Sequence, residues 1–100
     1  MRELGGKGKV PFATNTGVTV GSSSTVALAL NHQRLEAIFV NDSDEVIYLF
    51  RGTPAVLNQG IRLNASGGSY IEDVYLGAFT AICASGSKVL TVSETEAETI

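Results

Sequence analysis

The most informative part of the sequence is Leu35-Glu36-Ala37-Ile38-Phe39-Val40-Asn41-Asp42-Ser43-Asp44-Glu45-Val46-Ile47-Tyr48-Leu49-Phe50. Two runs, 35–40 and 45–50, are apolar on both faces of a strand and flank a polar turn at 41–44. This pattern predicts two central β-strands joined as a hairpin. One face of the pair would lie on the core, and another part of the chain would cover the other face.

The rest of the chain follows the same pattern with shorter strands and Gly-, Ser- and Asn-rich turns. No ten consecutive residues show a helical period. Strands are predicted at Gly17–Gly21, Thr25–Leu30, Ile61–Leu63, Ser69–Glu72, Ala78–Ala84 and Lys88–Ser93. Seven or eight short strands at this spacing are typical of an antiparallel sandwich or barrel. The predicted class is all-β: a single antiparallel β-sandwich, jelly-roll-like, with flexible N- and C-terminal arms.

The two ends of the chain differ from its middle in charge. Residues 1–9 hold three basic residues against one acid and three glycines, whereas residues 94–100 hold three glutamates and no base. We therefore expect a flexible basic Gly-rich arm at 1–13, a β-sandwich domain at 14–93 and an acidic tail at 94–100. A basic arm that reaches the acidic tail of a neighbouring copy is one hypothesis for these ends.

Composition limits the classes of partner. The 100 residues carry a formal net charge of −3, and 17% of them are charged, against roughly 25% in an average soluble domain. A net negative chain without a basic stripe is not expected to bind nucleic acid or an anionic membrane. The longest apolar runs have five residues, and no signal peptide is evident, so we expect synthesis in the cytoplasm.

Few residues are suited to chemistry. His32 lies in a polar turn, and Cys83 lies in an apolar strand where a buried structural thiol is the ordinary interpretation. Structural zinc requires three or four Cys or His ligands, and this chain has two such residues. The acidic stretches 42–45 and 72–73 have the composition of turn residues and lack the spacing of a calcium loop. We predict no catalytic, cofactor-binding or metal-binding residue, no cofactor and no enzymatic activity.

The apolar content exceeds what one sandwich core needs, and few charges are present to protect the edges of the sheets. This combination is typical of a subunit that packs against copies of itself or against a larger assembly.

The middle of the chain resembles small bacteriophage virion proteins of the decoration and head- or tail-accessory β-sandwich type. The resemblance covers about Val18 to Glu94. It is carried by Val18-Thr19-Val20, Asn31, Arg34, Asn41, Tyr48, Gly60-Ile61-Arg62-Leu63, Gly67-Gly68, Tyr70, Tyr75-Leu76-Gly77, Ala81-Ile82-Cys83-Ala84-Ser85-Gly86 and Val89-Leu90-Thr91-Val92-Ser93-Glu94.

This resemblance implies a non-enzymatic virion structural protein, a capsid decoration or cement subunit that reinforces contacts between major capsid proteins. It implies a homo-oligomer, with a homotrimer favoured, that binds the major capsid protein and is located in the virion. The alternative is a phage tail or head–tail accessory protein, or a module that binds carbohydrate on a host surface through aromatic residues such as Tyr70 and Tyr75. A small hydrolase is a third possibility and would need a cleft with convergent carboxylates or an activated serine.

Overall fold

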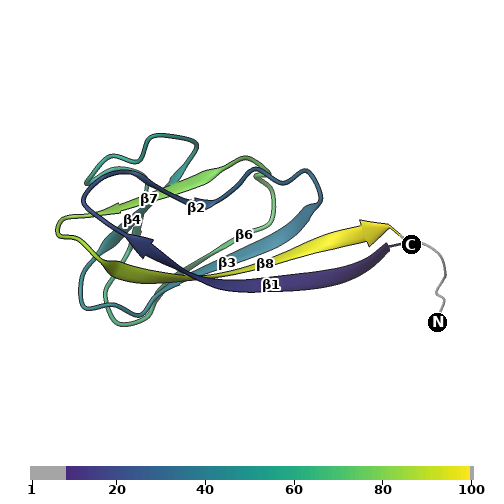
Figure 1. The fold of residues 1–100 in the computed structure, drawn as a ribbon, viewed down its shortest axis with the longest axis horizontal. Coiled ribbons are helices and arrows are strands. Elements are labelled where there is room, and N and C mark those ends of the chain that lie inside the picture. The colour runs from purple at the N-terminus through teal and green to yellow at the C-terminus, as the bar shows by residue number, and fades with distance from the viewer. Residues whose placement is uncertain (1–8, 100) are drawn as a thin grey trace.

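The regular structure of the described part of the chain consists of β-strands. The computed structural model describes residues 9–99, and within this range it contains eight strands and no helix. The strands are β1 (Lys9–Val20), β2 (Thr25–Leu28), β3 (Arg34–Asn41), β4 (Ile47–Arg51), β5 (Ile61–Leu63), β6 (Gly68–Glu72), β7 (Phe79–Cys83) and β8 (Lys88–Thr99). They form two antiparallel four-stranded sheets that face each other (Figure 1). The predicted all-β class and single β-sandwich are therefore confirmed.

The order of the strands is that of a jelly roll. Sheet A has the order β1-β8-β3-β6, and sheet B has the order β2-β7-β4-β5. The first four strands alternate between the sheets, and the last four return beside them in reverse order. Each sheet therefore brings together strands from both ends of the sequence.

The core lies between the two sheets and contains one face of each. Phe39 of β3 and Phe79 of β7 meet from opposite sheets with ring centroids 4.7 Å apart, and Tyr75 meets Phe79 edge-on at 5.3 Å. Such tilted and edge-to-face contacts are the favoured geometries for aromatic pairs. The other members of the core cluster are aliphatic side chains and one thiol: Val20, Ala27, Ala37, Ile47, Leu49, Leu63, Ala81, Cys83, Leu90 and Val92.

The predicted hairpin between residues 35–40 and 45–50 is wrong. β3 pairs with β6 and β8, whereas β4 pairs with β5 and β7, so the acidic turn crosses from one sheet to the other. The fully buried Asn41 holds this corner: its Nδ2 donates to the carbonyl oxygens of Glu45 at 2.7 Å and Leu63 at 2.9 Å. Its Oδ1 accepts hydrogen bonds from the backbone N–H and the hydroxyl of Ser43. The corner is thus tied to β5 rather than closed as a hairpin.

The expected boundaries of the two arms also differ from the structure. β1 begins at Lys9 and β8 ends at Thr99, and the two strands pair over twelve residues without a shift in register. In Figure 1 this ladder continues past the rest of the sandwich. Glu94 and Glu96 point to the same face of β8, and the carboxylates of both accept hydrogen bonds from Asn31 Nδ2. Residues 1–8 and 100 of the expected arms lie outside the described residues.

The outer faces of the two sheets are covered differently. On sheet B, the Thr80 hydroxyl donates to the Gly52 carbonyl oxygen, and the Ala55 N–H donates to the Ser24 hydroxyl, each at 2.8 Å. These bonds hold the β4–β5 connection over the outer face of β7, and every residue of β7 is buried. The expected cover over an apolar strand therefore exists, but it lies over β7, whereas the outer side chains of β3 on sheet A are half-buried.

Candidate interaction surface

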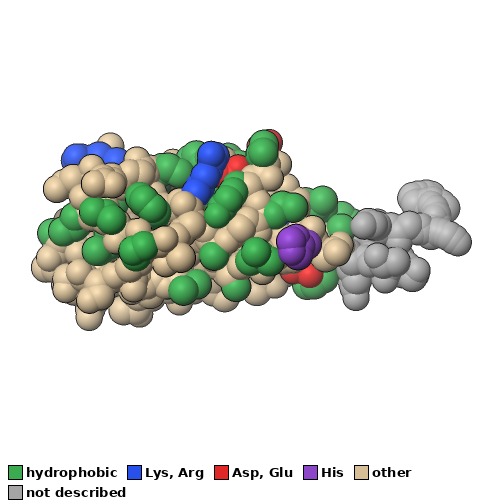
Figure 2. All heavy atoms as spheres, turned by 90° about the horizontal axis from the view of Figure 1, so that it is seen from above, with side chains coloured by type: hydrophobic (Ala, Val, Ile, Leu, Met, Phe, Trp, Pro, Cys, Tyr) green, Lys and Arg blue, Asp and Glu red, His purple; other side chains and the backbone are tan. Residues whose placement is uncertain are grey.

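The two residues with the most reactive side chains are not arranged for chemistry. His32 is exposed in the turn before β3, where Figure 2 shows the histidine on the surface. Cys83 is fully buried, and its thiol donates to the Ser85 carbonyl oxygen at 2.7 Å. Burial raises the pKa of the Cys83 thiol, and the nearby Glu45 carboxylate raises it further. A neutral, enclosed thiol is a poor nucleophile and a poor metal ligand.

The acidic turn uses its carboxylates in contacts with nearby strands. Asp44 accepts a hydrogen bond from Lys88 Nζ at 2.7 Å, which lowers the pKa of the Asp44 carboxyl. Glu45 accepts from both the N–H and the hydroxyl of Ser85. Among residues 9–99, no group of three or more His, Cys, Asp or Glu side chains could hold a metal ion.

The second acidic pair contributes one buried carboxylate, that of Glu72. Its Oε2 accepts from the N–H groups of Val74 and Tyr75 at 3.0 Å each, and its Oε1 accepts from Arg51 Nε at 2.8 Å and the Tyr70 hydroxyl at 3.0 Å. Burial alone would raise the pKa of Glu72, but these donors together lower it to about 2. Glu72 therefore remains ionised, and its bond to Arg51 of β4 joins sheet A to sheet B.

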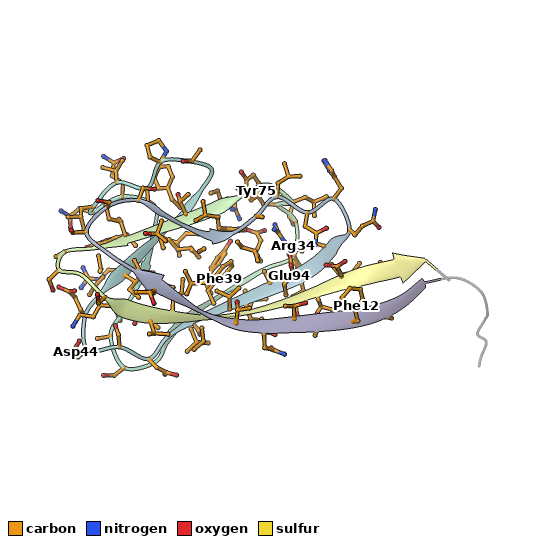
Figure 3. The ribbon with its side chains drawn as sticks, viewed as in Figure 1. Phe12, Arg34, Phe39, Asp44, Tyr75 and Glu94 are labelled. Carbon is orange, nitrogen blue, oxygen red and sulfur yellow. The ribbon has the colours of Figure 1, made fainter. Side chains whose placement is uncertain are left out.

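Arg34 is a buried charge at the start of β3, although it directly follows a polar turn in the sequence. Its guanidinium donates to three carbonyl oxygens, those of Ala29, Tyr75 and Gly77, at 2.7–3.0 Å. Its Nε donates to Glu94 Oε2 at 2.9 Å, and Figure 3 shows Arg34 beside both Tyr75 and Glu94. A charge with this many partners is structural, and only its position directly before an apolar strand distinguished it in the sequence.

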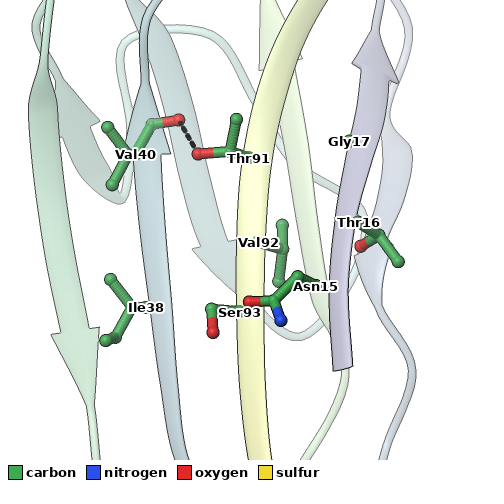
Figure 4. A pocket seen from close by; sticks show the side chains of 8 residues that line it. All are labelled: Asn15, Thr16, Gly17, Ile38, Val40, Thr91, Val92 and Ser93. Atoms are coloured by element: carbon green, nitrogen blue, oxygen red, sulfur yellow. Dashed lines mark hydrogen bonds between the residues drawn. The ribbon is translucent and has the colours of Figure 1, made fainter. Parts of the chain in front are cut away.

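The clusters described above all stabilise the fold. The remaining candidate for an interaction surface is the outer face of sheet A. Three levels of side chains cross it, and none of them is charged: Asn15-Ser93-Ile38-Ile71, Gly17-Thr91-Val40-Ser69 and Thr19-Val89. A shallow groove of about 380 Å³ runs along β8 between the side chains of β1 and β3 (Figure 4). The wall on the β1 side is low at Gly17, which has no side chain. Four aliphatic side chains stand on this face, and Ile71 and Val89 are 59% and 49% exposed.

Beside this face lies the free edge of sheet A. β1 is an edge strand, and its residues from Pro11 to Val20 include no charged side chain. The other three edge strands, β2, β5 and β6, have only three to five residues each. An open, uncharged strand of this length can pair with another chain. The sequence patterns did not reveal this edge, because the first half of β1 has the composition of a flexible arm.

The comparisons with known proteins support the fold. No family model and no curated protein matches this chain. One similar solved structure is described as "Bacillus endospore appendages form a novel family of disulfide-linked pili". The two structures superpose with a TM-score of 0.64 and 15% sequence identity. The alignment covers 96% of this chain and 92% of that chain. At this identity the likeness shows a shared fold.

This comparison corrects the function expected from the sequence. The similar structure belongs to a bacterial pilus rather than to a phage capsid, so the prediction of a capsid decoration subunit is wrong. The alternative of a tail accessory or carbohydrate-binding module fits a pilus poorly as well. The resemblance to virion proteins is tested by none of the comparisons and stays a prediction. No helix among the described residues is long and apolar enough to cross a membrane.

Proposed function

We propose that this chain is a non-enzymatic structural subunit that joins copies of itself into a surface fibre, by adding strands at the free edge of β1. The observation that carries this proposal is the long, uncharged edge strand. The similar structure is a pilus, and a pilus is a polymer of subunits, which supports an assembly role for the shared fold.

The hydrogen-bonding pattern identifies which backbone groups of β1 face the free edge. The Ala97 N–H donates to the Gln33 carbonyl oxygen at 2.9 Å, so the backbone of Ala97 points away from β1. In an antiparallel ladder, the partner of such a residue also points away from the shared side. Pro11 is the partner of Ala97, and the register continues without a shift. Its backbone therefore points to the free edge, as do those of Ala13, Asn15, Gly17 and Thr19.

This edge offers a regular row of four N–H donors and five carbonyl acceptors, because Pro11 lacks an N–H. None of the hydrogen bonds within residues 9–99 outside the strand ladders ends on these groups. Each bond to another strand would contribute on the order of 1 kcal/mol. A row of such bonds, repeated by every copy, is sufficient to join subunits into a polymer.

Copies of this chain would be joined without disulfide bonds, unlike the pili of the similar structure. The sequence contains one cysteine, and Cys83 is fully buried in β7. A disulfide between copies would require its sulfur to reach the surface of the subunit. Backbone hydrogen bonds and apolar contacts therefore have to supply the stability of the assembly.

Two proline substitutions one residue apart test the edge. Ala13→Pro removes an N–H that faces the free edge, whereas Thr14→Pro removes one that bonds to β8. We expect wild-type protein to form fibres in negative-stain electron microscopy and large species in sedimentation velocity. Ala13→Pro should abolish both while leaving the thermal midpoint of the subunit nearly unchanged.

Thr14→Pro is the matched control, because it introduces the same residue into the same strand. It should lower the thermal midpoint of the subunit, since it breaks the β1–β8 ladder. Wild-type protein that stays monomeric at several hundred micromolar would overturn the proposal. Fibres of Ala13→Pro that are indistinguishable from wild-type fibres would show that the edge is not the joint.

A further inference from the structure

We propose which strand fills the free edge of β1: the same strand of a second copy, paired antiparallel about a two-fold axis at Asn15. This inference deepens the proposed function, on which it rests for the role of the edge as a joint. Strand addition by itself does not say whether β1 pairs with β1 or with another edge of the sandwich. The length, the backbone groups and the side chains of β1 all favour a second β1.

The length of β1 distinguishes it from the other edge strands. β1 has twelve residues, whereas β2, β5 and β6 have four, three and five. In an antiparallel pair, only every second residue directs its backbone to a given neighbour. Each short strand could therefore bond to β1 through no more than about three residues, and most groups of the edge would stay unpaired. Among the edge strands of residues 9–99, a second β1 alone matches this edge along its whole length.

The uncharged run within β1 selects the register. No charged residue occurs from position 10 to position 20, and Asn15 is at the centre of this run. A two-fold axis at Asn15 pairs the run with itself and leaves Lys9 beyond both ends. A centre nearer to the start of β1 would bring Lys9 into the paired segment. A centre nearer to its end would leave the first residues of the run unpaired.

This register satisfies every hydrogen-bond donor of the edge. The N–H groups that face outward belong to Ala13, Asn15, Gly17 and Thr19. Across the axis they meet, in that order, the carbonyl oxygens of Gly17, Asn15, Ala13 and Pro11 of the second copy. Four donors from each of two copies give eight backbone hydrogen bonds across the joint. Pro11, which has no N–H, lies at the end of this ladder, where proline is tolerated.

The side chains on the inner face of β1 complement one another across the same axis. Phe12 would lie opposite Val18 of the second copy, and Thr14 would lie opposite Thr16. Aromatic–β-branched and threonine–threonine pairs are favourable cross-strand contacts. Phe12 is 42% exposed near the projecting end of the ladder (Figure 3), whereas Val18 packs against the core cluster. The joint would therefore cover an exposed aromatic ring.

The side chains on the outer face are small or self-complementary. Ala13 would lie opposite Gly17, so neither residue crowds the other. Asn15 would lie opposite Asn15 of the second copy. An amide group both donates and accepts hydrogen bonds, so two identical Asn15 side chains can bond to each other. No like charges meet in this register.

A two-fold joint is closed, because both copies use the same edge. It therefore produces a pair with one continuous eight-stranded sheet, in the order β6-β3-β8-β1-β1-β8-β3-β6, from two four-stranded sheets. The fibre of the proposed function would then be a polymer of such pairs, joined to one another at other surfaces.

A single cysteine on the axis tests this arrangement. The two Cα atoms of residue 15 would lie about 5.5 Å apart across the axis, within the range of a disulfide. Asn15→Cys should therefore give a covalent dimer under oxidised glutathione, seen by non-reducing electrophoresis. Wild-type protein should give none, because Cys83 is buried.

Thr19→Cys is the matched control for chance collisions. Thr19 is exposed on the same face of the same strand as Asn15. In the proposed register it would lie eight residues from its counterpart in the second copy, about 27 Å away. It should therefore form far less covalent dimer than Asn15→Cys.

Opposite charges at position 15 give a non-covalent test. Asn15→Asp and Asn15→Lys each place two like charges against one another at the axis. Each variant alone should therefore associate several-fold more weakly than wild type in sedimentation velocity. An equimolar mixture should regain the association, because a mixed pair contains one acid and one base. Thermal midpoints of both variants close to that of wild type would show that the fold is retained.

The outcomes separate this inference from the proposed function. Fibres that form while Asn15→Cys fails to cross-link would exclude the two-fold pair and leave edge assembly intact. As much dimer from Thr19→Cys as from Asn15→Cys, or a charge mixture that associates no better than either variant alone, would also overturn this register. A covalent dimer of Asn15→Cys in a chain that forms no fibres would support the pair and contradict the fibre.

Discussion

Arg34 Nε of β3 lies 2.9 Å from Glu94 Oε2 of β8, and the side chain of Arg34 is only 1% exposed. The same guanidinium donates hydrogen bonds to three carbonyl oxygens, which lie in the β2–β3 and β6–β7 connections. One buried side chain thus fixes the end of the sandwich from which the β1–β8 ladder continues.

Removing the charge of Arg34 should destabilise the fold. Arg34→Met keeps most of the side chain's length but leaves Glu94 and three carbonyl oxygens without their donor. We expect the free energy of unfolding to fall by about 3–5 kcal/mol, measured by urea denaturation. Glu94→Gln, which keeps a hydrogen-bonding group, should cost less. Equal, small losses for both variants would contradict the structural role of Arg34.

The low pKa of Glu72 predicts how stability depends on pH. Its carboxyl has a pKa of about 2 in the folded chain, against 4.5 ordinarily. A lowered folded-state pKa contributes stability above pH 4.5, and that contribution is lost as pH falls toward 2. We expect a loss on the order of 3 kcal/mol across this window. Stability measured from pH 7 to pH 2 should fall less steeply in Glu72→Gln, which has no proton to bind.

The thiol of Cys83 should react only when the chain unfolds. It is fully buried, and burial raises its pKa. Ellman's reagent should therefore label native protein far more slowly than protein in 6 M guanidinium chloride. Reductant should leave the size distribution of assembled protein unchanged. Dissolution of the assembly by dithiothreitol would contradict a non-covalent joint.

Gly60 should not tolerate a side chain. Its φ is +85°, and a Cβ there would lie 2.6 Å from the Leu49 carbonyl oxygen and 2.9 Å from Phe50 Cδ1. We expect Gly60→Ala to lower the free energy of unfolding by about 1–3 kcal/mol. Gly86→Ala is the control, because a Cβ at Gly86 meets nothing within 4 Å. Its thermal midpoint should stay close to that of the wild type.

Local sequence patterns were sufficient to predict where most strands lie, but not the full length of β1 and β8 or the partners of the strands. Alternation and turn residues located most strands within a few residues, because burial of one face imposes a period of two. The partners of β3 and β4 were wrong because sheet pairing is decided by contacts far apart in the sequence. The short turn between them resembles a hairpin, and only the buried Asn41, bonded to Leu63, makes it a corner.

The existence of a candidate interaction surface could be predicted from the sequence, but its position could not. Low charge and excess apolar content indicated contact with other copies, and both features are found on sheet A. Its position could not be derived, because the face joins residues from β1, β3, β6 and β8. The burial of Arg34 could not be derived for a similar reason: two of its carbonyl partners lie 41 and 43 residues away.

The pairing of Lys9 with Thr99 has a practical consequence for engineering this chain. A passenger domain attached before β1 and one attached after β8 would leave the sandwich from the same tip, about 5 Å apart at their roots. Cargo carried there would project away from the corner at Asn41. A scaffold built from this domain could display two different passengers side by side at each repeat.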